Sequence, residues 1–148
     1  MPLGRNRWLI AAGSLSAAAA MMHIAIIFGG ADWYRFFGAG EGMARMAEQG
    51  SVRPTLMTLA IAAILAVWAL YAFAGAGLVR RLPLMRTALV AITAIYLMRG
   101  LWLFAALALA PEAVDAFLIW SSLIVLGYGA AHAVGTWLAW PRLSRPPR

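Results

Sequence analysis

The chain has 148 residues, of which 64% are hydrophobic and only 11% are charged, against roughly 25% in an average soluble domain. A soluble domain of this size could not bury so much apolar surface, so the composition predicts an integral membrane protein. It excludes a disordered chain, a coiled coil and a nucleic-acid-binding module. The absence of cysteine excludes thiolate catalysis and cysteine-ligated metal centres.

Four apolar runs divide the sequence, and each is long enough to cross a bilayer core of about 30 Å at 1.5 Å per residue. Backbone groups in lipid must be satisfied within the segment, so we expect helices rather than strands. The predicted fold is all-α: a single membrane domain over 1–148, with transmembrane helices at about 8–28, 55–79, 87–110 and 116–140. The first run is longer than the hydrophobic region of a signal peptide, so we expect an uncleaved helix.

Prolines and glycines mark the predicted helix ends. Pro54 fits the first turn of the second helix, where its missing N–H costs little. Pro111 follows the third helix and Pro141 ends the fourth. The segment Gly75-Ala76-Gly77 has the composition of a helix stop.

The distribution of arginine predicts the orientation. Eight arginines fall on one side of the predicted membrane and three on the other; the eight are Arg5, Arg7, Arg80, Arg81, Arg86, Arg142, Arg145 and Arg148, and the three are Arg35, Arg45 and Arg53. Cytoplasmic loops carry the excess of positive charge, so both termini are predicted to be cytoplasmic in a bacterial inner (plasma) membrane. Anionic lipid headgroups are the expected partners of the arginine-rich ends. A homo-oligomer is also expected, and nucleic acid is not.

The outward first connection, 29–53, is predicted to hold a short amphipathic helix from about Glu41 to Gln49. Its aromatic residues suit the membrane interface, and its two faces differ in polarity. Apolar residues share one face and charged residues the other; the apolar set is Met43, Met46 and Ala47, and the charged set is Glu41, Arg45 and Glu48. The helix either lies on the outer surface or forms a re-entrant cap over the bundle.

Arg99 lies inside the third apolar run, where a charge costs a few kcal/mol. No acid lies inside any of the four runs. Its partner is therefore an outer-loop acid, a lipid or substrate anion, backbone carbonyls or a tyrosine, and its role is either structural or functional. If the outer loop dips inward, Asp32 or Glu41 could pair with Arg99. The predicted polar pocket comprises His23, Asp32, Tyr34, Arg35, Glu41, Tyr96, Arg99 and Tyr128.

A second set of residues in the fourth run predicts close helix packing. The seam comprises Gly127, Ala131, His132 and Gly135, and small residues of this kind let another helix approach. Hydrogen bonding between helices is the expected role of Tyr128 and His132. The depths of His23 and His132 differ by about 15 Å at 1.5 Å per residue, so the two cannot share one haem iron, and no metal or other cofactor is predicted.

The stretch from Pro54 to Gly100 and the loop segment YRFFGAGEGMA resemble an uncharacterised type of small four-helix bacterial inner-membrane protein. The resemblance implies the same topology and no catalytic residue. We expect a non-catalytic protein that binds a lipid or small amphiphile, or assists transport or assembly. The alternative is a membrane enzyme acting on a lipid or quinone at the outer leaflet, with His23 and Asp32 or Glu41 as acid–base groups.

Overall fold

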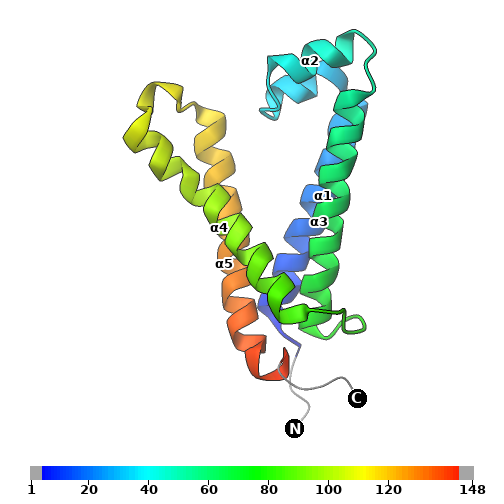
Figure 1. Ribbon diagram of the computed structural model, residues 1–148, viewed down its shortest axis with the longest axis vertical. Helices are drawn as coiled ribbons and strands as arrows, with labels where there is room; N and C mark the ends of the chain where they lie inside the picture. The colour runs from blue at the N-terminus through cyan, green and yellow to red at the C-terminus, as the bar shows by residue number, and fades with distance from the viewer. Residues whose placement is uncertain (1–4, 144–148) are drawn as a thin grey trace. The chain divides into compact units, whose positions relative to one another are not determined.

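The computed structural model describes residues 5–143, and all regular secondary structure in that range is helical, with no strand. The elements in chain order are α1 (Arg7–Phe36), α2 (Glu41–Glu48), α3 (Arg53–Ala76), α4 (Met85–Leu109), the short 3-10 helix η1 (Pro111–Ala113) and α5 (Ala116–Leu143) (Figure 1). The all-α prediction is therefore confirmed. The four long helices α1, α3, α4 and α5 are each long and apolar enough to span a membrane.

Three helices end at a glycine in the left-handed region, where a side chain would be strained. Gly38, Gly50 and Gly77 have φ of 71°, 71° and 81°. After α3, the N–H of Gly77 donates to the carbonyl of Ala74 (3.1 Å) and that of Leu78 to Phe73 (2.9 Å). This pair of bonds satisfies two of the last free carbonyls of the helix. The glycine stop predicted from the sequence thus ends α3 at Ala76, before the predicted end at 79.

Helix α1 departs from the predicted first span at Gly30. The prediction ended the helix at 28 and treated 29–53 as a loop, whereas helical structure resumes beyond Gly30 and continues to Phe36. Gly30 has φ 65° and ψ −153°, a combination that essentially only glycine adopts. The backbone therefore breaks at one residue and starts a second, short helical segment over 31–36.

The C-terminal end of α5 also differs from the prediction. Pro141 was expected to end the helix, but it lies inside α5, which continues to Leu143. Proline lacks the N–H that would donate to the carbonyl one turn earlier. Near a helix end this removes a single bond, so the final turn can still form around it.

The described chain forms two compact units. The first comprises the start of α1, up to Ser16, together with everything from Trp68 onward; the second comprises Ala17–Val67. That the chain acts as a single membrane domain stays a prediction.

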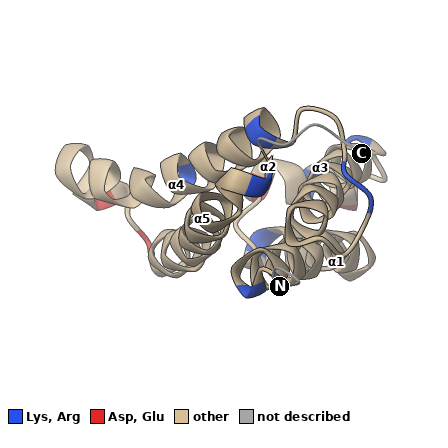
Figure 2. Cartoon of the chain, turned by 90° about the horizontal axis from the view of Figure 1, so that it is seen from below, with Lys and Arg blue, Asp and Glu red and all other residues tan. Residues whose placement is uncertain are grey.

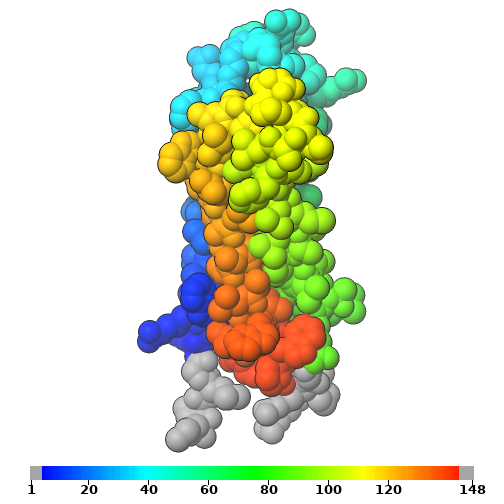
Figure 3. Space-filling model, turned by 90° about the vertical axis from the view of Figure 1, so that its left-hand side faces the viewer, coloured from blue at the N-terminus to red at the C-terminus, as the bar shows by residue number. Residues whose placement is uncertain are grey.

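The first unit is packed around small residues. Its buried core includes Leu9, Ala12, Ala72, Leu89 and Ala139. Helices α4 and α5 lie side by side within it (Figures 1 and 3). A line of buried residues along α4 forms its packing face; these are Met85, Leu89, Ile92, Tyr96, Gly100, Leu103 and Ala106. Their spacing of three and four residues places them on one side of the helix.

The second unit has a smaller core, in which α2 packs against α1. Ile26, Tyr34 and Ala44 are buried together. The Thr58 hydroxyl of α3 donates to the Tyr34 hydroxyl at 3.4 Å and to the carbonyl of Pro54 at 2.8 Å. Tyr34 therefore connects the 31–36 segment to α3.

Most of the apolar surface of the long helices is not covered by the described chain. In each long helix, no more than 28% of the most apolar 18-residue stretch is buried. Exposed residues include Phe28, Leu109 and Trp137. Soluble monomers rarely expose continuous apolar surface of this extent. Four such helices suggest a multi-pass membrane protein.

Candidate functional site

Arg99 projects from α4 towards the start of α5. Its Nη1 donates to the hydroxyl of Ser122 at 3.0 Å and its Nη2 to that of Ser121 at 3.3 Å. Ser122 is fully buried, whereas Arg99 stays exposed. No carboxylate of residues 5–143 lies within 4.0 Å of the guanidinium. Arg99 is thus a cation in an apolar helix whose hydrogen-bond partners within residues 5–143 are two neutral hydroxyls.

The direction of the Arg99 side chain follows from the packing of its neighbour. Gly100 packs directly on Leu126, because a Cβ atom added to Gly100 would lie 2.9 Å from the Leu126 backbone nitrogen. The guanidinium, by contrast, lies level with Ser122, about one turn closer to the α4–α5 connection. Long cationic side chains bend in this way towards polar surroundings while their stems stay in apolar surface.

Tyr96 lies one turn before Arg99 at the centre of a buried aromatic cluster. Its ring contacts those of Trp68, Tyr128 and His132, with centroids 4.9, 5.6 and 5.1 Å away. Its hydroxyl shares a 2.9 Å hydrogen bond with that of Ser16. Of the predicted pocket residues, Tyr96 and Tyr128 are therefore in contact with each other, in the same unit as Arg99.

His132 belongs to this cluster and is completely buried. Its Nδ1 donates to the carbonyl of Tyr128 at 2.9 Å. Its Nε2, and the Oγ1 of Thr136 one turn further along α5, are buried without a hydrogen-bond partner in the described chain. Buried polar atoms of this kind usually bind ordered water.

Two glycines of α5 lie in close contact with neighbouring helices, and one of them belongs to the predicted packing seam. A Cβ atom on Gly135 would lie 2.7 Å from Leu9, and one on Gly129 would lie 2.6 Å from Leu97. Gly127, in contrast, has no atom within 4 Å of that position. Ala131 is buried with the core. Gly129 therefore admits a neighbouring helix within the described chain, and the place of Gly127 in a packing seam stays a prediction.

The other predicted pocket residues lie in the second unit, where Arg35 is the centre of a charge cluster. Arg35 binds Glu41 through two bonds of 2.8 and 3.1 Å and Glu48 at 2.8 Å. Asp32 lies 3.4 Å from its Nη1, and Arg45 also binds Glu41 at 3.1 Å. The carboxylates that were expected to approach Arg99 thus have a basic partner within their own unit.

This pairing changes the chemistry of Glu41. Hydrogen bonds from Arg35 and then Arg45 lower the pKa of its carboxyl to about 2. General acid–base catalysis at neutral pH is most efficient when the pKa lies near the operating pH. Glu41 therefore suits a structural ion pair better than a proton-transfer role.

His23 and Tyr34 are held by separate contacts in the second unit. The Nδ1 of His23 donates to the carbonyl of Ala19 at 2.8 Å, which is a bond within the same helix. Tyr34 is buried and accepts from Thr58. Because His23, Asp32, Tyr34, Arg35 and Glu41 lie in one unit and Tyr96, Arg99 and Tyr128 in the other, the single pocket joining all eight stays a prediction.

Sequence reasoning missed the serine partners of Arg99 and the role of Glu48. The short α4–α5 connection carried a usable signal: two helices joined by a few residues run antiparallel, so Arg99 must lie beside the first turns of α5. Serine was not among the expected partners, which were an acid, an anion, backbone carbonyls or a tyrosine. Glu48 was assigned to the charged face of its helix, without the partner from α1.

No group of three or more His, Asp or Glu side chains within residues 5–143 could hold a metal ion. The geometry therefore offers two polar centres, Arg99 with its serines and Arg35 with its carboxylates. Comparison with protein-family models, with curated proteins and with solved structures finds nothing that matches the chain.

Proposed function

We propose that the protein is a non-catalytic, multi-pass protein of a bacterial inner membrane that binds an anionic lipid or amphiphile at Arg99. The observation that carries this proposal is the surroundings of the guanidinium, which contacts Ser121 and Ser122 and no carboxylate of the described chain. A cation within an apolar helix requires an opposite charge or water. Hydroxyl groups orient it without neutralising it.

The chemistry of the guanidinium defines the ligand class. Arginine keeps its charge under all physiological conditions and presents five N–H donors in a plane. Carboxylate and phosphate groups match this arrangement with two parallel hydrogen bonds. Because Arg99 is exposed on an apolar helix, a ligand with an anionic head and an apolar body fits the site better than a soluble anion.

The depth of the site agrees with a headgroup. Ser122 lies six residues into α5, about 9 Å below the start of the helix. The guanidinium is level with this serine, so an anionic group held near the membrane interface is within its reach.

The distribution of charge along the α4–α5 pair supports the proposed orientation. Basic segments lie at the end next to the α3–α4 turn, and the acidic residues Glu112 and Asp115 lie at the α4–α5 connection (Figure 2). The positive-inside rule places the basic end in the cytoplasm. The connection, and Arg99 below it, then belong to the outer half of the bilayer.

The experiment is native mass spectrometry of the full chain released from mild detergent, with lipid analysis of the same sample. We expect the wild type to retain an anionic lipid class and Arg99→Leu to retain less of it. Arg45→Leu is the matched control, because it removes one arginine of the α2 surface far from this site in sequence. Equal retention by wild type and Arg99→Leu would overturn the proposal.

Two further variants separate binding from folding. Arg99→Lys keeps the positive charge but replaces the planar guanidinium, which can form two parallel hydrogen bonds, by an ammonium group. We therefore expect this variant to retain part of the lipid. The double variant Ser121→Ala/Ser122→Ala keeps the guanidinium of Arg99 but removes the two hydroxyls that orient it. We expect it to lose less of the retained lipid than Arg99→Leu does. Near-UV circular dichroism of each variant reports whether its tertiary packing is intact. If all three variants lose both the lipid and this signal, Arg99 is structural and the proposal fails.

A further inference from the structure

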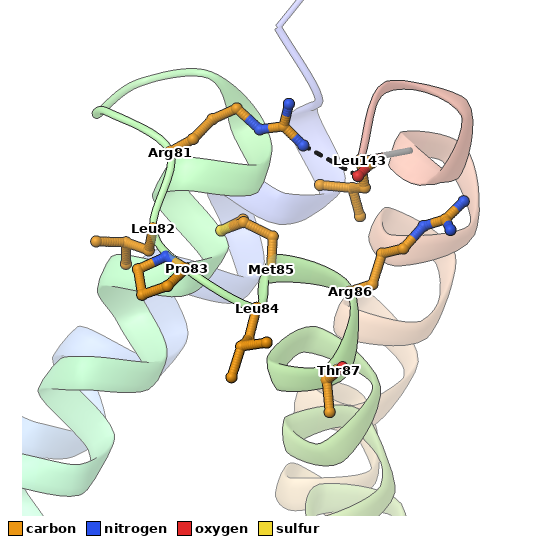
Figure 4. Close-up of a pocket in the computed structure, with 8 residues that line it drawn as sticks. All are labelled: Arg81, Leu82, Pro83, Leu84, Met85, Arg86, Thr87 and Leu143. Atoms are coloured by element: carbon orange, nitrogen blue, oxygen red, sulfur yellow. Dashed lines mark hydrogen bonds between the residues drawn. The ribbon is translucent and has the colours of Figure 1, made fainter. Parts of the chain in front are cut away.

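A second basic site lies at the opposite end of the α4–α5 pair. A cavity of about 510 Å³ opens where the α3–α4 turn meets the end of α5. Arg81, Arg86 and the hydroxyl-bearing Thr87 line it, together with Leu143 (Figure 4). Both guanidinium groups point towards the end of α5, whereas Leu82 and Pro83 lie on the other side of the cavity (Figure 4).

The turn is fixed to α5 by a hydrogen bond and by an unusual backbone conformation. The Nη2 of Arg81 donates to the carbonyl of Leu143 at 3.0 Å. Leu84 precedes α4 with φ 53°, a left-handed conformation that is uncommon for a residue with a side chain. Strained residues of this kind persist where the surrounding structure determines them, and they concentrate at ligand sites.

An apolar groove begins where the cavity ends. The guanidinium of Arg86 lies over the ring of Trp140, 4.5 Å from the ring centroid. Trp140 also lines a groove of about 460 Å³ between α4 and α5, whose walls include Val90, Leu97 and Trp137. The Arg86–Trp140 pair therefore connects a cationic cavity to an apolar groove along the same two helices.

We propose that this cavity and groove bind one anionic phospholipid of the leaflet at that end, the cytoplasmic one in the proposed orientation. The phosphate lies between Arg81 and Arg86, and an acyl chain lies along the groove. Basic pockets between membrane helices on this side select anionic headgroups, and tryptophan is favoured at the membrane interface. A free phosphate would use the cavity alone, and an apolar peptide would use the groove alone.

The inference rests on the same membrane insertion as the proposed function but uses different residues and the opposite leaflet. Arg99 variants should therefore leave this site intact. Conversely, variants of Arg81 and Arg86 should leave the Arg99 site intact, so each proposal can fail without the other.

The test measures binding to the full chain in nanodiscs made of phosphatidylcholine alone or mixed with phosphatidylglycerol, with native mass spectrometry of retained lipid. We expect the affinity of this site for phosphatidylglycerol to fall roughly fivefold for each arginine removed, in Arg81→Gln and Arg86→Gln. Arg45→Gln is the control, since it removes one equal charge elsewhere. Equal retention in all variants, or an equal loss in Arg45→Gln, would contradict the proposal.

Two additional arms identify the ligand. Soluble glycerol phosphate should compete poorly with phosphatidylglycerol, because it cannot occupy the groove. If it competes fully, the cavity binds anions without specificity for lipid, and the proposal is overturned. Trp137→Ala should weaken retention of the lipid but not of glycerol phosphate. Arg86→Lys, which keeps the charge, should retain more lipid than Arg86→Gln, and if it retains no more, the arginine acts only through packing.

Discussion

The α4–α5 pair and the α1–α2 connection are stabilised by opposite kinds of contact. Along α4 and α5, glycines admit neighbouring side chains at close distance. Arg99, in the middle of α4, donates hydrogen bonds to two serine hydroxyls of α5. At the α1–α2 connection, Arg35 meets three carboxylates. A cation already surrounded by acids of its own unit has a structural role. The ligand site proposed above lies at the cation whose partners are neutral.

The largest expected effect comes from filling a glycine contact in the first unit. Gly135→Val would place a Cβ atom 2.7 Å from a Leu9 side-chain carbon and 2.9 Å from its backbone nitrogen. Since the backbone cannot move aside cheaply, we expect a loss of about 3 kcal/mol in the free energy of unfolding, measured by denaturant titration in detergent micelles.

Gly127→Val is the matched control in the same helix, because nothing lies within 4 Å of the added Cβ atom. We expect it to change the stability by less than about 0.5 kcal/mol. If both substitutions cost the same, the close approach at Gly135 is not what stabilises the unit.

A smaller effect is expected from removing the central cation of the second unit. Arg35→Leu leaves Glu41, Glu48 and Asp32 close together without their shared partner. We expect faster amide hydrogen exchange in α2, with unchanged exchange in α4 and α5. Arg53→Leu is a suitable control on the neighbouring helix. Unchanged exchange in α2 would mean that its apolar contacts through Ala44 suffice.

The smallest effect is a pH dependence of α2. The carboxyl of Glu41 has its pKa lowered from an ordinary 4.5 to about 2, so the ionised form is favoured in the folded chain. The contribution of its ion pairs is therefore complete above about pH 4.5 and is lost as the pH falls towards 2. Amide exchange in α2 should accelerate over this range, and Glu41→Gln should remove most of the acceleration. The effect is small because the groups are exposed and screened by solvent.

The four long helices could be predicted from the sequence because each is a continuous apolar run, and apolar length alone determines which segments can span a bilayer. The glycine stop after α3 could be predicted because only glycine suits the left-handed position. The helical segment over 31–36 could not be predicted from the sequence, because Tyr34 within it packs against α2 and α3. The continuation of α5 through Pro141 was missed because one absent hydrogen bond near a helix end is tolerated.

The candidate site was predicted in part. Arg99 was identified because a charge inside an apolar run is rare. Its partners Ser121 and Ser122 were not identified, because hydroxyl side chains are common in membrane helices and follow no distinctive sequence pattern. The pairing of Arg35 with Glu48 depends on the direction in which the chain turns after Gly30 and Gly40. That direction follows from tertiary packing and not from local sequence.

In the proposed membrane topology, the break at Gly30 also determines how much of α1 has to match the bilayer thickness. As one uninterrupted helix, the 30 residues of α1 would be about 45 Å long, whereas the part before Gly30 is about 35 Å, close to the lengths of α3 and α4. A span much longer than the hydrocarbon layer must tilt or thicken the surrounding lipid. Because α1 breaks at a position that only glycine accommodates, its continuous part stays close in length to α3 and α4, and Arg35 follows the break.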